Sequence, residues 1–288
     1  MALYHAAYGP PDAPRLLFLH GGPGASHDYM LPQMLELAND YRLVFYDQRG
    51  GGRSRSDDRA PVSWRTHVED LAALVRELAL VPLTLVGYSW GGLLSLLYAI
   101  AAAGGFRDDG FALPAGAPMP ARMVLVCPAP ATNAFRAQFS EELARRQRAP
   151  WIETARAELA ESGLRERDLS AYSKRLFELG VAGYFADPSR ARELTPFRVI
   201  GRVQQSVWES LGDYDLTPKL PLIAAPALVL HGAHDAIPLP SSRLIASTLP
   251  RGELEVLDES AHVPYVEGSE AFFASVREFL RRTMRAEP

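Results

Sequence analysis

The segment Gly87 to Gly91 constrains the fold of this chain more than any other. It reads Gly-Tyr-Ser-Trp-Gly, it follows the apolar run Leu83 to Val86, and it precedes Gly91 to Ala103, which is rich in leucine and alanine and free of proline. A chain that passes from a strand to a helix within so few residues turns sharply, and glycines around the serine remove side chains that would clash. The order of strand, turn and helix predicts that Ser89 stands exposed at the tip, where it can act as a nucleophile.

A serine hydroxyl is a weak nucleophile at neutral pH, so the chain must also supply a base and a group that orients the base. Asp235 lies in the loop after the apolar run Ala227 to Leu230, and His262 lies in the loop after the alternating run Leu254 to Leu257. The order of serine, acid and histidine places all three at the carboxyl ends of strands. We expect His262 to take the proton from Ser89 and Asp235 to hold the imidazole.

Two other aspartates and two other histidines are weaker candidates for these roles. Asp213 and Asp215 precede the strand-like run that leads to Asp235, and aspartates in such segments more often make hydrogen bonds within a turn. His231 and His234 are close neighbours of Asp235, so a base at either position would point away from the nucleophile. We expect packing or loop roles for both histidines.

A glycine-rich segment, His20 to Gly24, follows the apolar run Leu16 to Leu19. Glycines let backbone N–H groups approach a substrate, and we predict that Gly22 and Trp90 donate to the oxyanion of a reacting carbonyl group. A plain Gly-Pro turn would account for one or two of these residues but less well for four. The segment lacks the lysine of a phosphate-binding loop, so it does not indicate a nucleotide site.

Four motifs together resemble the prolyl iminopeptidase branch of the α/β-hydrolase superfamily. They are His20 to Gly24, Asp47 to Ser54, Gly87 to Gly92 and His262 to Glu267. Ser26 to Tyr29 and Asp213 to Leu216 also resemble the tricorn-interacting aminopeptidases of that branch. The resemblance covers nearly the whole chain except residues near 104–120, and Asp47 to Ser54 is its most specific part.

The resemblance, together with alternating strand-like and helix-like segments, implies an α/β-hydrolase fold with a mostly parallel sheet of about seven strands, flanking helices and an inserted helical cap. We expect a core domain formed by residues 1–130 and 226–288 and a cap formed by residues 131–225. Few residues precede the second strand, so the first strand of the usual eight-stranded sheet is expected to be missing. The predicted strands are Leu3 to Tyr8, Leu16 to Leu19, Leu43 to Tyr46, Leu83 to Val86, Met123 to Val126, Ala227 to Leu230 and Leu254 to Leu257.

The resemblance implies a serine peptidase that releases an N-terminal proline or another small residue from short peptides through an acyl-enzyme. In that family glutamates bind the free α-amine of the substrate, but here the matching positions are Gln204 and Ala236. A neutral group binds a cation less well, although Glu209, Glu178 or Glu193 could compensate. An esterase, lactonase or amidase acting on an uncharged small substrate therefore stays open, as does a non-catalytic ligand-binding receptor on the same scaffold.

The expected substrate pocket combines residues around the nucleophile with residues of the cap. The candidates are Gly21, Tyr88, Gln204, Trp208 and Glu209. Aromatic side chains of the cap could form its wall or pack in the cap's own core. These aromatic residues are Trp151, Tyr172, Phe177, Tyr184, Phe185 and Trp208.

Composition narrows the remaining functions. A net charge of −4 and a pI near 6.0 give no basic surface for nucleic acid. No export signal or membrane-spanning segment is visible, so the cytoplasm is the expected location and a small molecule or short peptide the expected partner. His5, His27 and His67 lack ligand-like spacing, so we expect no metal and no cofactor. Cys127, the single cysteine, is expected to be buried.

Overall fold

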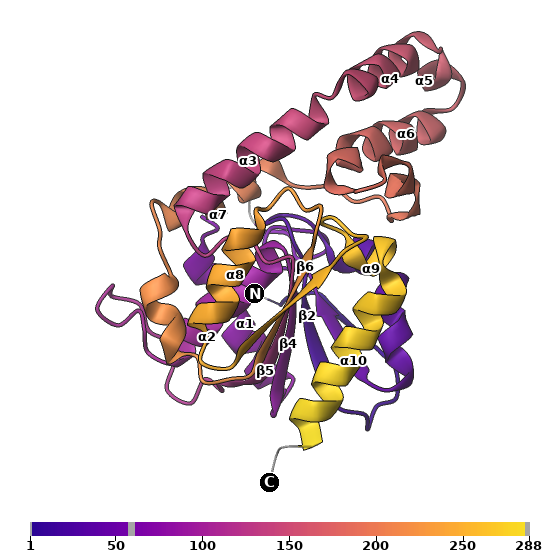
Figure 1. The fold of residues 1–288 in the computed structure, drawn as a ribbon. Helices are drawn as coiled ribbons and strands as arrows, with labels where there is room; N and C mark the ends of the chain where they lie inside the picture. The colour runs from indigo at the N-terminus through magenta and orange to yellow at the C-terminus, as the bar shows by residue number, and fades with distance from the viewer. Residues whose placement is uncertain (1, 57–60, 286–288) are drawn as a thin grey trace.

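The computed structural model describes residues 2–56 and 61–285, and its centre is one twisted sheet of seven strands in that part of the chain (Figure 1). The strand order is β1-β3-β2-β4-β5-β6-β7. The first strand runs antiparallel to its neighbour, and every other neighbouring pair is parallel. The strands are β1 (His5–Tyr8), β2 (Arg15–Leu19), β3 (Arg42–Tyr46), β4 (Leu83–Tyr88), β5 (Pro120–Val126), β6 (Ala227–Gly232) and β7 (Gly252–Leu257).

Helices cover both faces of this sheet (Figure 1). The α-helices are α1 (Trp64–Glu77), α2 (Trp90–Ala102), α3 (Asn133–Gln147), α4 (Pro150–Glu161), α5 (Leu164–Arg167), α6 (Leu169–Val181), α7 (Gly201–Leu211), α8 (Leu239–Thr248), α9 (Pro264–Glu267) and α10 (Ser269–Arg285). Short 3-10 helices are η1 (His27–Met30), η2 (Gln33–Asn39), η3 (Ala182–Tyr184), η4 (Pro188–Glu193) and η5 (Thr217–Leu222).

The two faces of the sheet form two separate hydrophobic cores. Successive side chains of a strand point to opposite faces. Leu17 therefore belongs to the core that contains residues of α1, α2 and α8, whereas Leu16 and Phe18 belong to the core that contains residues of η2, α9 and α10. Strand β4 lies in the middle of the sheet and is buried along its whole length. A parallel strand that is covered on both faces requires a continuous apolar run, as the sequence provides.

The chain between β5 and β6 leaves the sheet and forms the helices α3 to α7 with η3 to η5. In Figure 1, α3, α4, α5 and α6 extend away from the sheet as a separate layer. Together with the sheet order, this arrangement confirms the predicted fold class, including the seven strands and the inserted helical cap. The exact domain boundaries at residues 130/131 and 225/226 stay a prediction.

The segment 104–120, which the family resemblance does not cover, lies partly on the surface and partly in the core. Most of it is exposed, but Phe106 and Phe111 are buried. Both rings contact the Trp64 ring, with centroid distances of 4.9 and 5.1 Å. The two phenylalanines therefore anchor the segment to α1, because burial of aromatic surface stabilises the contact.

The helices of residues 2–56 and 61–285 include none that is both long and apolar enough to span a bilayer.

Candidate active site

Ser89 lies at a sharp turn between β4 and α2, at the carboxyl edge of the sheet. Its backbone φ of +53° falls in a region that residues other than glycine rarely adopt. A Cβ added at Gly87 would overlap the carbonyl oxygen of Gly91, and a Cβ added at Gly91 would overlap that of Leu19. The flanking glycines therefore allow the close packing that the turn needs, as the sequence indicated.

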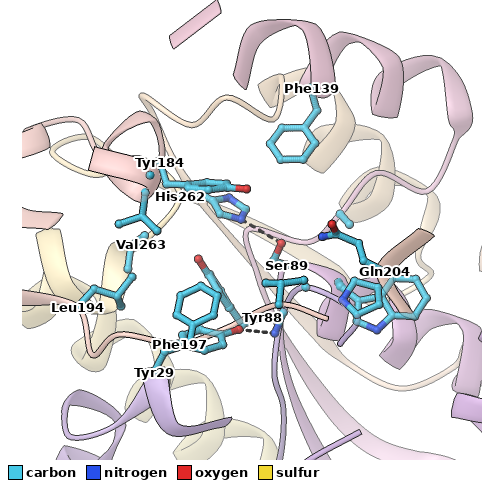
Figure 2. A pocket seen from close by; sticks show the side chains of 18 of the residues that line it. Tyr29, Tyr88, Ser89, Phe139, Tyr184, Leu194, Phe197, Gln204, His262 and Val263 are labelled. Atoms are coloured by element: carbon cyan, nitrogen blue, oxygen red, sulfur yellow. Dashed lines mark hydrogen bonds between the residues drawn. The ribbon is translucent and has the colours of Figure 1, made fainter. Parts of the chain in front are cut away.

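Asp235 and His262 lie next to this serine in space, although they are far from it in the sequence. The Nε2 atom of His262 is 3.0 Å from the Oγ atom of Ser89 (Figure 2). The Nδ1 atom of His262 is 2.9 Å from Oδ2 of Asp235. Asp235 follows β6 and His262 follows β7, so the parallel strands bring both loops to the edge where Ser89 stands. Ser89 can therefore pass its proton to His262, and Asp235 can hold the imidazole ring in place.

The Asp235 carboxylate is buried and has two partners. Burial alone would raise its pKa, but the neighbouring His262 and the Ile237 N–H, which donates to Oδ1 at 2.9 Å, keep the pKa below its usual value. Asp235 is therefore ionised at neutral pH. An ionised acceptor at Nδ1 keeps a hydrogen on that nitrogen and leaves Nε2 free to accept the Ser89 proton.

The four weaker candidates lie away from Ser89. Asp213 and Asp215 are exposed, and Asp215 accepts hydrogen bonds from Thr217 within a turn. His231 is buried, where the Ser242 hydroxyl lies 2.9 Å from its Nδ1 atom, and His234 is exposed. None of the four lines the cavity at Ser89 in the described chain.

Gly22 and Trp90, the predicted oxyanion donors, line the same cavity as Ser89. Gly22 has a φ of +56°, a turn conformation that glycine adopts more easily than other residues do. The N–H of the neighbouring Gly21 is occupied, because it donates to the Tyr29 hydroxyl at 2.5 Å. Gly22 and Trp90 thus stay the candidates for the oxyanion.

Gln48 joins the glycine-rich loop to the nucleophile turn. Its backbone N–H donates to Nε2 of His20 at 3.1 Å, and its side-chain amide donates to the His20 carbonyl at 2.8 Å. Its side-chain oxygen accepts the indole N–H of Trp90 at 2.8 Å. Both candidate oxyanion segments are therefore fixed by one buried side chain of the most specific sequence motif.

Asp47, the first residue of that motif, holds the neighbouring loops. Its buried carboxylate accepts the N–H of His27 at 2.9 Å and the N–H of Arg53 at 2.8 Å. A Cβ at Gly52 would overlap the same carboxylate, which explains the third glycine of the motif. The motif therefore holds the loops around the site, and none of its residues lines the cavity.

Two buried histidines near these loops, His20 and His67, should lower the free energy of unfolding as the pH falls. Burial lowers the pKa of His20 and of His67 from 6.5 to about 4. In the unfolded chain both take up a proton as the pH falls through about 6.5, whereas in the folded protein both stay neutral until about pH 4. The free energy of unfolding is therefore expected to fall over this range, by up to about 3 kcal/mol per histidine. Urea denaturation between about pH 7 and pH 4 measures the effect.

The variant His67→Gln isolates one of these groups. Glutamine can still donate to the Arg49 carbonyl, which lies 3.1 Å from Nε2 of His67, but it does not titrate. This variant should lose less stability on acidification than the parent protein. Equal losses in the two proteins would contradict the assignment to His67.

Glu267 connects the loop of His262 to the cap, a role that the sequence did not indicate. Its buried carboxylate accepts the N–H of Ala261 at 2.9 Å and the N–H of Ala186 at 2.7 Å. Burial raises its pKa, and the N–H donors only partly offset this effect. The N–H of His262 also donates to the Tyr184 carbonyl at 2.9 Å. Cap and histidine loop are therefore joined at two points, which together fix the position of the loop.

A cavity of about 420 Å³ opens in front of Ser89, between the sheet edge and the cap (Figure 2). Most of its wall is aromatic or aliphatic. The aromatic residues that line it are Tyr29, Tyr88, Trp90, Phe139, Phe177, Tyr184, Phe197, Trp208 and Tyr265. The rings of Tyr88, Tyr184 and Phe139 lie 5.3, 5.2 and 6.0 Å from the His262 ring, measured between centroids. The cavity therefore suits a small and largely apolar substrate.

The structure brings most of the predicted pocket residues to this cavity, but not all of them. Gly21, Tyr88, Gln204 and Trp208 line it. Glu209 is exposed and accepts a hydrogen bond from Gln205 at 2.7 Å, so the structure places it outside the cavity wall.

The proposed replacements for the family's glutamates and three of the cap aromatics also lie elsewhere. Glu178 pairs with Arg175 and Glu193 pairs with Arg190, each within the cap surface. Among the cap aromatics, Phe177, Tyr184 and Trp208 line the cavity. Those that do not line it are Trp151, Tyr172 and Phe185. Sequence reasoning missed Tyr29, Phe139 and Phe197 because segments far apart in the sequence bring them together.

Cys127 is buried next to the acid and histidine of the site, as its apolar surroundings indicated. Ligand atoms of Cys127, Asp235 and His262 lie within 4.8 Å of one another, a spacing that a metal ion could bridge. Burial raises the pKa of the Cys127 thiol well above its usual value, so the thiol stays protonated. A protonated thiol is a poor metal ligand, and Asp235 already bonds to His262. The absence of a metal stays an expectation.

Comparison of the sequence with known proteins identifies a family and several relatives of this chain. Residues 16–275 match a family model described as the alpha/beta hydrolase family. The proline iminopeptidase of Heyndrickxia coagulans is 26% identical over 92% of this chain and 90% of that protein. The proline iminopeptidase of Saccharolobus solfataricus is also 26% identical, over 96% and 88%. A match to the proline iminopeptidase of Lactobacillus crispatus is 45% identical but spans only 29% of each chain.

Solved structures of proteins with several different activities share this fold. The proline iminopeptidase of Mycobacterium smegmatis has a TM-score of 0.66 at 21% identity, covering 99% of this chain and 96% of that one. An esterase from Exiguobacterium antarcticum has a TM-score of 0.69 at 20% identity, covering 97% and 95%. The enol-lactonase of Burkholderia xenovorans has a TM-score of 0.65 at 22% identity, covering 97% and 96%. At these identities the likeness concerns the fold alone.

Proposed function

Because the chain belongs to the alpha/beta hydrolase family, we propose that it is a serine hydrolase that cleaves an ester or amide bond of a small molecule through an acyl-enzyme on Ser89. The observation that carries the proposal is the continuous hydrogen-bonded series from Asp235 through His262 to Ser89. This series ends at a cavity with apolar walls. Such an arrangement activates a hydroxyl group that would otherwise be a weak nucleophile.

The first half of the reaction forms the acyl-enzyme. Ser89 attacks the substrate carbonyl while His262 takes its proton at Nε2. The N–H groups of Gly22 and Trp90 then stabilise the negative oxygen of the tetrahedral intermediate. His262 returns the proton to the leaving alcohol or amine, and the acyl group stays on Ser89.

The second half releases the acid. His262 takes a proton from water, the resulting nucleophile attacks the acyl carbonyl, and Ser89 leaves as an alkoxide that regains the proton from His262. Asp235 stays ionised throughout and stabilises the imidazolium form of His262. His262 thus carries every proton transfer in both halves, and the two N–H donors stabilise the oxyanion of each tetrahedral intermediate.

A second candidate is an aminopeptidase that releases N-terminal proline or another small residue. The full-length relatives named proline iminopeptidase favour it. The cavity favours the first candidate, because no aspartate or glutamate of the described chain lines it to balance a substrate ammonium group. At the two positions that match the amine-binding glutamates of the family, this chain has Gln204 and Ala236, which are both neutral.

Three substrates separate these candidates: prolyl p-nitroanilide, its N-acetylated form and p-nitrophenyl butyrate. We expect p-nitrophenyl butyrate to be hydrolysed, and we expect the free amine of prolyl p-nitroanilide to give no advantage over the blocked compound. Initial rates of p-nitroaniline or p-nitrophenol release measure the three reactions.

Other results would change the proposal. Cleavage of only the free-amine substrate would establish the aminopeptidase and require an acidic group to reach the amine. A protein that turns over none of the three substrates and that a fluorophosphonate does not label at Ser89 would not be a serine hydrolase. It would then fit the third possibility, a non-catalytic receptor.

A further inference from the structure

The charge of the substrate cavity is unusual for a site that would hold an ammonium group. Among the described residues that line it, none is acidic and Arg136 is the one arginine or lysine. The other polar side chains of the cap in the wall include the amides of Gln147 and Gln204. Coulomb forces in such a cavity favour an anion and oppose a cation.

No acid lies three or four residues from Arg136 along its helix, in contrast to five other arginines of the cap. Five cap arginines pair with a glutamate three or four residues away along a helix. These pairs are Arg145 and Arg146 with Glu142, Arg156 with Glu153, Arg175 with Glu178, and Arg190 with Glu193. The residues three and four positions from Arg136 are Thr132, Asn133, Phe139 and Ser140, all uncharged. No carboxylate within residues 2–56 and 61–285 forms an ion pair with Arg136, so its charge is available to a ligand.

Aromatic stacking fixes the position of this guanidinium relative to the nucleophile. Its central carbon lies 4.8 Å from the centroid of the Trp208 ring, and Trp208 packs edge-on against Trp90 with a centroid distance of 5.2 Å. Trp90 directly follows Ser89. Two aromatic side chains therefore connect the guanidinium to the residue that follows the nucleophile, and Arg136 is partly buried.

From this arrangement we infer that Arg136 is a specificity-determining residue that binds a carboxylate of the substrate. The substrate class is then an ester, lactone or amide whose carbon chain also carries a free carboxylate group. A guanidinium can donate two parallel hydrogen bonds to a carboxylate. One cation beside apolar walls suits a monoanion better than a doubly charged phosphate. The inference rests on the proposed function, since it concerns the substrate of the same site.

Two esters of nearly equal size test the inference. The mono-p-nitrophenyl ester of glutaric acid carries a carboxylate, and p-nitrophenyl valerate is its uncharged counterpart. We expect the parent protein to have a higher kcat/KM for the glutarate ester. In Arg136→Gln the ratio of the two kcat/KM values should fall about 10- to 100-fold, because a hydrogen-bonded charge pair is lost. The control Arg145→Gln removes an exposed arginine that pairs with Glu142, and it should leave the ratio unchanged.

A binding measurement keeps the inference testable if the protein proves not to turn over either ester. In the Ser89→Ala background, calorimetric titration should give tighter binding of the glutarate monoester than of the valerate ester, and Arg136→Gln should remove this difference. Binding that depends on Arg136 without turnover would contradict the proposed function but support the carboxylate site. Turnover that depends on Ser89, with a ratio unchanged in Arg136→Gln, would overturn the carboxylate site alone.

Discussion

Replacing Ser89 by alanine is expected to lower kcat/KM for p-nitrophenyl butyrate by about 10,000-fold or more. Alanine removes the hydroxyl oxygen that lies 3.0 Å from Nε2 of His262, so no acyl-enzyme can form. The backbone of the turn should survive, because alanine keeps the Cβ atom and the Ser89 side chain does not cap α2. Mass spectrometry of the protein after reaction with a fluorophosphonate should show one adduct in the parent protein and none in the variant.

The double variant Ser89→Ala with His262→Ala tests whether the two residues act as one unit. The second substitution should reduce the rate little further, because a base without its nucleophile contributes little. The control Ser247→Ala changes a serine of α8 whose hydroxyl bonds only to the helix backbone, and it should keep parental activity. Near-normal activity of Ser89→Ala would show that another residue is the nucleophile.

The fold and the placement of Ser89, Asp235 and His262 could be predicted because local sequence patterns and the family resemblance both indicate them. The apolar run of β4 suits a central strand, and the glycines at positions 87 and 91 suit a close turn. The loops after β6 and β7 reach the same sheet edge because parallel strands end together. These features need no knowledge of how distant segments pack.

The substrate cavity could not be predicted in the same way because the cap forms a large part of its wall. The sequence offers Glu209 as a cap residue that could replace the missing glutamates, but its position on α7 leaves it in solvent, where it bonds to Gln205. The sequence does not single out Arg136, since a high density of arginine and glutamate usually marks an exposed helix face. The difference between Arg136 and its paired neighbours becomes visible only when Trp208 and the cavity are placed beside it.

Replacing Asp235 by asparagine is expected to lower kcat by about 1,000- to 10,000-fold while changing KM little. The amide group of asparagine can donate to Nδ1 of His262, which would move the imidazole hydrogen to Nε2. A protonated Nε2 cannot accept the Ser89 proton. Steady-state kinetics with p-nitrophenyl butyrate, supported by urea denaturation to show that the variant folds, would measure the loss.

Asp213→Asn and Asp215→Asn are the matched controls because they make the same chemical change at exposed aspartates between α7 and η5. Asp215 bonds to Thr217, and Asp213 accepts a bond of 3.3 Å from Asn133, so either variant can affect local stability. Neither contacts His262 in the described chain, and both should keep activity within about twofold, as surface substitutions usually do. A large loss of kcat in Asp213→Asn with little change in Asp235→Asn would mean that the acid is misassigned. The buried position of Asp235 and its 2.9 Å contact with His262 argue for the opposite result.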